Sequence, residues 1–85
     1  MKNTIQKVAE KIGKEYIMDM TSIVTTELVQ QVERYELTEG YNEADLVNSI
    51  ADNLINLSLL AESLGIREKC DRAIASKSEK LGREV

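Results

Sequence analysis

The chain has 85 residues, with 15 acidic and 11 basic side chains, a formal net charge of −4, no proline, no histidine and one cysteine. A chain of this length forms one domain, and the lack of proline together with a total of three aromatic residues favours helices over strands. Without histidine, sites that use imidazole as a base or metal ligand are excluded, and a single cysteine excludes an intrachain disulfide.

The hydrophobic pattern predicts four helices in one domain that covers residues 1–85. The expected helices cover residues 3–14, 16–38, 43–64 and 67–82. Asn3 with Gln6 three residues later predicts a capping box at the start of the first helix. Gly13 then either ends this helix or bends it, and the sequence leaves both options open.

The second expected helix carries apolar residues at helical spacing from Ile17 to Tyr35. Its stretch TSIVTT at residues 21–26 is rich in β-branched side chains, which lower helix propensity. The periodicity extends over about twenty residues, and summed over that length it outweighs the local propensity. We therefore expect one continuous helix.

The third expected helix follows a break at Gly40, and Asn42 is expected to cap it. Its apolar face is formed by Leu46, Val47, Ile50, Leu54, Leu57, Ala61 and Leu64, and Ile55, Leu59 and Leu60 widen that face almost all the way round. In so short a chain this pattern predicts a central helix covered by a second subunit. The expected interface residues are Leu54, Leu57, Leu59, Leu60 and Leu64. Gly65 is suited to a left-handed stop after this helix.

The fourth expected helix has a narrow apolar stripe of Ile66, Cys70 and Ile74. In this stripe Cys70 is interpreted as a small buried apolar residue rather than a reactive thiol. Taken together, the elements predict an all-α fold, an antiparallel bundle of three to four helices that self-association into a dimer or tetramer completes.

Acidic residues on the second and third expected helices recur at a spacing of three. Glu33 and Glu36 can share one helix face, as can Ser49 and Asp52 on the next helix. The short connection through Gly40 makes these helices antiparallel, so the two faces can lie opposite each other. Carboxylates that converge from neighbouring helices can hold a hard cation such as magnesium.

On these residues, the segment from 33 to 84 resembles the MazG-like all-α nucleoside triphosphate pyrophosphohydrolases. Residues 33–36 (ERYE) are similar to the first half of the family's acidic pattern, and residues 49–52 (SIAD) to the second half. The resemblance implies a self-associating bundle in which Glu33, Glu36 and Asp52 bind magnesium and nucleoside triphosphates are cleaved to monophosphate and pyrophosphate. Ser49 stands where the pattern has a fourth carboxylate.

Three functions follow from these features. The loss of a ligand at Ser49 favours a non-enzymatic helical oligomer that has no cofactor and acts by binding another protein. Such a protein could be a regulator, an inhibitor or an antitoxin-like partner, and small proteins of this kind are common on mobile elements. The alternatives are a magnesium-dependent pyrophosphohydrolase and a catalytically inactive relative that still binds a nucleotide. In the last case Asn48, Asn53 and Asn56 would contact base or sugar, although such asparagines also suit a polar face between helices or toward solvent.

Charge and hydropathy limit the other partners. Residues 15–64 carry ten acidic side chains and one arginine, which disfavours direct binding of nucleic acid. The longest uncharged stretch, residues 53–61, is shorter than the roughly 20 residues that span a bilayer. The first residues lack the apolar run of a signal peptide, so a cytoplasmic protein is expected.

Overall fold

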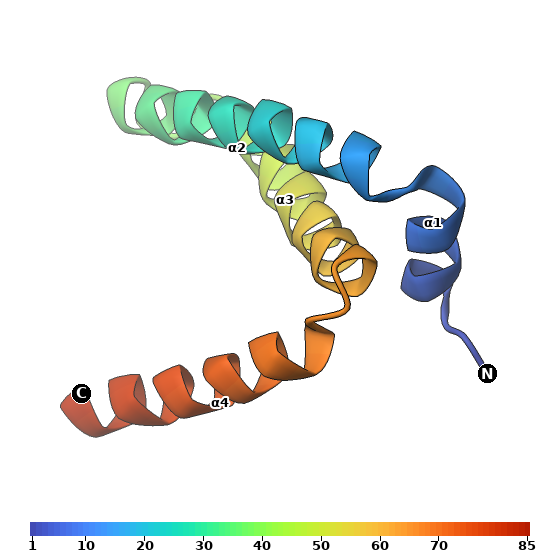
Figure 1. The fold of residues 1–85 in the computed structure, drawn as a ribbon. Helices are drawn as coiled ribbons and strands as arrows, with labels where there is room; N and C mark the ends of the chain where they lie inside the picture. Colours follow the sequence, from blue (N-terminus) through green and yellow to red (C-terminus); the bar gives the residue numbers. More distant parts are fainter.

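The computed structural model describes all of residues 1–85 and contains four α-helices and no strand (Figure 1). The helices are α1 (Thr4–Ile12), α2 (Lys14–Leu37), α3 (Glu43–Ser63) and α4 (Arg67–Glu84). The predicted all-α fold class is confirmed, and every helix begins and ends within two residues of its expected bounds. None of the helices combines the length and the apolar character needed to cross a bilayer.

The start of α1 has the expected capping box. The backbone N–H of Gln6 donates to Asn3 Oδ1 at 2.9 Å, and the backbone N–H of Asn3 donates to Gln6 Oε1 at the same distance. Gly13 ends α1 rather than bending it, with a φ of 90° that a side chain rarely allows. The chain therefore turns sharply there and enters α2.

The β-branched run of α2 is helical, as the periodicity predicts, and its threonine hydroxyls bond back onto the helix. Thr21 Oγ1 donates to the carbonyl of Ile17 at 2.8 Å, and Thr25 Oγ1 donates to that of Thr21 at 2.7 Å. Thr26 Oγ1 makes the equivalent bond to the carbonyl of Ser22 at 2.7 Å. Each hydroxyl thus donates within the helix, and Thr21 Oγ1 also accepts a hydrogen bond from Asn56 of α3.

The turn between α2 and α3 corrects one expectation. Asn42 occupies the position before α3, but its side chain makes no cap hydrogen bond to that helix. Instead, Asn42 Nδ2 donates to the carbonyl oxygen of Gln31 at 3.0 Å and to Gln31 Oε1 at 2.7 Å. The reason is burial, because Asn42 lies against α2, where an unpaired amide would be costly. Asn42 therefore fastens the turn to α2 and does not cap α3.

The buried core is small and lies where α1, the start of α2 and the end of α3 meet. Ala9, Ile17 and Leu59 form it, and Leu60 packs against it with further partly buried residues. Because α3 contacts each of the other helices, the expectation that it is central is confirmed. At the far end of the α2–α3 hairpin, no second apolar core is present.

Helix α4 leaves the rest of the chain at an open angle, as Figure 1 shows. Gly65, with a φ of 69°, makes the predicted left-handed stop, and the backbone N–H of Ile66 donates to the carbonyl of Ala61 at 3.0 Å. No residue of α4 is buried.

The single chain is far from compact. Its accessible surface is 6828 Å², whereas a compact monomer of 9.6 kDa exposes about 5,100 Å². Its radius of gyration is 15.3 Å, against about 12 Å for a compact domain of this length. The excess surface is about 1,700 Å², and much of it is carried by large apolar side chains.

Candidate functional site

The acidic residues singled out in the sequence do not converge in the structure. Glu33, Glu36 and Asp52 are all exposed, and no group of three or more acidic or cysteine side chains is arranged to hold a cation. Asn53 Nδ2 donates to the carbonyl oxygen of Val24 across the hairpin at 2.9 Å, which fixes the register of α2 against α3. Asp52 is therefore level with the middle of α2, about 12 Å along its axis from Glu33 and farther from Glu36.

The short turn is the physical reason for this separation. Because only residues 38–42 join α2 to α3, Glu33 and Glu36 lie near the closed end of the hairpin. Ser49 does not occupy a vacant ligand position. Its side chain is buried, and its backbone carbonyl accepts a 2.7 Å hydrogen bond from Asn53 Nδ2.

Two of the three asparagines assigned to a nucleotide lie between the helices. Asn53 and Asn56 are each only 5% exposed, and Asn56 Nδ2 donates to Thr21 Oγ1 of α2 at 2.6 Å. Asn48 is exposed and makes no hydrogen bond of this kind. No buried side-chain nitrogen or oxygen lacks a partner, so nothing in this strip is free to meet a ligand. The polar interface reading of Asn53 and Asn56 is the one the structure supports.

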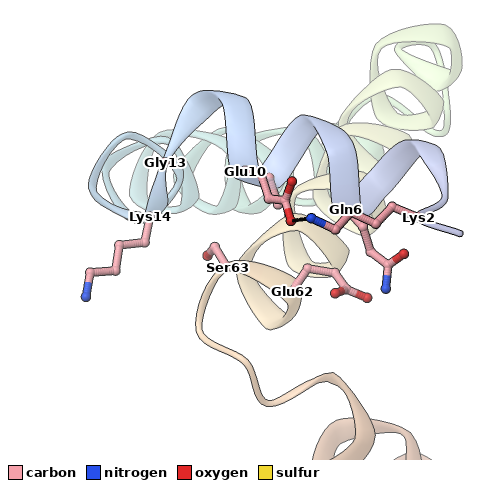
Figure 2. Close-up of a pocket in the computed structure, with 8 residues that line it drawn as sticks. Lys2, Gln6, Glu10, Gly13, Lys14, Glu62 and Ser63 are labelled. Carbon is pink, nitrogen blue, oxygen red and sulfur yellow. Dashed lines mark hydrogen bonds and ion pairs between the residues drawn. The ribbon is translucent and has the colours of Figure 1, made fainter.

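A polar hollow of about 380 Å³ lies between α1 and the end of α3 (Figure 2). Lys2 and Glu10, both well exposed, form an ion pair along α1 on one side of the hollow. Glu62 turns toward Arg67 at the start of α4, 3.7 Å away. Of the charged residues that line the hollow, Lys14 alone makes no ion pair, and the hollow holds no group poised for chemistry.

One side of α3 is apolar and uncovered along most of its length. We call this surface the α3 seam, formed by the exposed residues Val47, Ile50, Leu54, Leu57 and Leu64 together with Ala61, which is 7% exposed. Its residues alternate at spacings of three and four, which is the heptad pattern of a helix that packs on another helix. Leu54 is 63% exposed and Leu57 49% exposed, so no helix of this chain covers the middle of the seam.

The C-terminal half of the seam lines a groove of about 490 Å³ between α3 and α4. Leu54, Leu57 and Ala61 line it from α3, and Cys70 and Ile74 are among the residues that line it from α4. Cys70 is half-buried, less enclosed than the sequence predicts. Mixed charges stand at the rim, where Arg67 and Asp71 pair at 3.1 Å.

The leucines predicted to form an interface divide into two groups. Leu54, Leu57 and Leu64 belong to the exposed seam, whereas Leu59 is buried in the core of the chain and Leu60 is half-buried beside it. The sequence pattern places the first three on the apolar face of α3 and the other two beside it, but the prediction assigned all five to one interface.

No known protein family, curated protein or solved structure matches this chain.

Proposed function

We propose that the chain is the subunit of a homo-oligomer that acts by binding another protein, as a regulator or inhibitor. The observation that carries this proposal is the reversed polarity of the α2–α3 hairpin, which buries polar residues and exposes apolar ones. Between α2 and α3 the chain buries Ser49, Asn53 and Asn56, whereas large apolar side chains of both helices lie on the surface. Monomeric proteins rarely leave so much contiguous apolar surface in water, and such surface is typical of association.

The energetics of the hairpin support the same proposal. A buried hydrogen bond contributes only about 1 kcal/mol net, because the same groups bond to water in the unfolded chain. A leucine moved from water into an interface contributes about 1.5 to 3 kcal/mol. The three-residue core of Ala9, Ile17 and Leu59 offers little of this second contribution. Association is therefore the main source of apolar burial open to this chain.

The surface best suited to a different protein is on α2. We call it the α2 acidic face, where exposed Tyr16 and Ile23 lie on the same side of the helix as Asp19 and Glu27. Apolar anchors within a negatively charged surround favour a partner with a basic, partly apolar surface. The ten acidic residues between 15 and 64 would steer such a partner toward the chain.

Site-specific photocrosslinking tests the binding of a partner protein. A crosslinking amino acid would replace Ile23 on the α2 acidic face or, as a matched control, Met18, which is similarly exposed on another side of α2. In extracts of cells that encode the chain, position 23 should crosslink to a different protein, and the yield of this adduct should fall as the salt concentration is raised. Position 18 should give no such adduct. Equal adducts at both positions, or adducts with the chain alone, would contradict the proposal.

The magnesium-dependent pyrophosphohydrolase is the alternative proposal. It rests on the likeness of residues 33–36 and 49–52 to the MazG-like pattern. In a single chain, however, the carboxylates that would bind magnesium do not converge. A mixture of nucleoside triphosphates with magnesium, assayed for pyrophosphate release, separates the two proposals. Release by the wild type that Asp52→Ala abolishes would establish the enzyme and overturn the non-enzymatic function.

A further inference from the structure

We propose that a second copy of this chain inserts its α3 into the groove between α3 and α4, so that the two α3 seams pack antiparallel about a twofold axis. The inference rests on the proposed function, since it names the surface through which the homo-oligomer forms. Each chain would then contribute its α4 to cover the partner's α3.

The first argument is the amount of surface that awaits burial. The chain exposes about 1,700 Å² more than a compact monomer of its mass. A stable interface of standard size buries about 800 Å² on each partner, and obligate dimers bury more. The excess is therefore large enough for an obligate dimer, and a short peptide in the groove would cover only part of it.

The second argument is the chemistry of the seam and its borders. The positions that flank the middle of the seam are Leu46, Ala51, Asn53, Ser58 and Leu60, and none of them is charged. Two copies of a chain with a net charge of −4 repel each other at long range, so a self-interface must avoid like charges at close range. The seam meets this requirement, whereas the α2 acidic face does not.

The third argument is the pattern of side-chain volumes, which selects the antiparallel orientation. With the twofold axis between Leu54 and Leu57, these two residues face each other, and Ile50 of one copy meets the small Ala61 of the other. In a parallel pair, Ala61 would face Ala61 and leave a gap in the middle of an otherwise leucine-rich seam. Close-packed interfaces avoid such gaps by setting large side chains against small ones.

The fourth argument concerns α4. This helix has no buried residue in the single chain, and its apolar residues Ile74 and Leu81 are each more than 60% exposed. An 18-residue helix without packing is only marginally stable in water. A partner α3 in the groove would cover Cys70 and Ile74 and hold α4 in place.

Substitution of one seam residue, with a matched control on the same helix, tests the surface. Leu57→Asp places a charge in the proposed interface, and Ile55→Asp places the same charge at a similarly exposed site off the seam. By light scattering, Leu57→Asp should weaken dimerisation at least about 100-fold, and Ile55→Asp should keep the wild-type mass. Circular dichroism checks that both variants remain helical.

Cysteine pairing tests the orientation without disrupting the seam. In a Cys70→Ser background, Val47→Cys and Leu64→Cys are prepared as separate proteins and then mixed under mild oxidation. Antiparallel seams bring these two positions together, so the disulfide should form between the two proteins in the mixture and in neither protein alone. A disulfide between two copies of the Val47→Cys protein, formed without the other protein, would indicate parallel seams and overturn the proposed geometry.

The outcomes separate this inference from the proposed function. A wild-type oligomer that survives Leu57→Asp and gives no mixed disulfide overturns the seam as the interface but leaves a homo-oligomer in place. A wild type that stays monomeric at every concentration contradicts the homo-oligomer itself.

Discussion

At the residue scale, the buried polar strip of α3 explains both the register of the hairpin and its weak apolar core. Asn53 bonds to the carbonyl of Val24, and Asn56 to the hydroxyl of Thr21, so the two helices can meet in only one register without leaving buried amides unpaired. The strip specifies the fold more than it stabilises it. Asparagine at these positions was compatible with several roles in the sequence, and only the packing of α2 decides between them.

Replacing one buried asparagine tests this account. Asn53→Ala removes two hydrogen bonds and leaves a small gap between the helices, so it should lower the free energy of unfolding by about 1 to 3 kcal/mol. Asn48→Ala on the exposed side of the same helix should change it by less than about 0.5 kcal/mol. Urea unfolding monitored by circular dichroism measures both variants, and equal effects would show that Asn53 is not a structural link.

Substitution of Ser49 tests whether this residue is a buried contact between helices or stands at the position of a missing metal ligand. Because Ser49 is 7% exposed and faces α2, Ser49→Glu would bury an unpaired carboxylate and should cost about 3 kcal/mol or more, with or without magnesium. Asn48→Glu, at an exposed neighbouring position off the α3 seam, should be nearly neutral. Melting curves in chelator and in magnesium check this, and a Ser49→Glu variant that magnesium restores to wild-type stability would support the cation site.

At the scale of elements, the four helices were predictable because their signals are local. Periodic apolar residues, the capping box at Asn3 and the glycines at 40 and 65 each act within a few residues. The role of Asn42 was not predictable, since its partner Gln31 lies eleven residues away on the facing helix. For the same reason, sequence spacing alone could not exclude that Glu33 and Asp52 meet.

The turn at Gly40 offers a prediction on one element. A Cβ at this residue would stand 3.2 Å from the ring of Tyr35, and its φ of 86° strains any side chain, so Gly40→Ala should destabilise the fold by about 1 to 2 kcal/mol. Gly82→Ala, within α4 and with open space around it, should instead raise stability by up to about 1 kcal/mol. Thermal unfolding of the two variants measures the contrast, and a Gly40→Ala protein as stable as the wild type would contradict the strained turn.

At the scale of the whole molecule, the central claim is that this chain is incomplete alone. In the proposed dimer, a second copy would cover the α3 seam and hold the projecting α4, and its interface would add to the small apolar core. The sequence predicted self-association from the surplus of apolar residues on α3. It could not say which leucines serve the core and which the surface, because that depends on where α1 docks.

The mass of the wild-type chain in solution tests this claim most directly. Sedimentation equilibrium at tens of micromolar, on the order of ordinary assay concentrations, compares the measured mass with the 9.6 kDa of one chain. We expect twice that mass or an even multiple of it, with a melting temperature that rises with protein concentration, because dissociation accompanies unfolding. A mass of 9.6 kDa across the whole concentration range, with a melting temperature independent of concentration, would contradict the account.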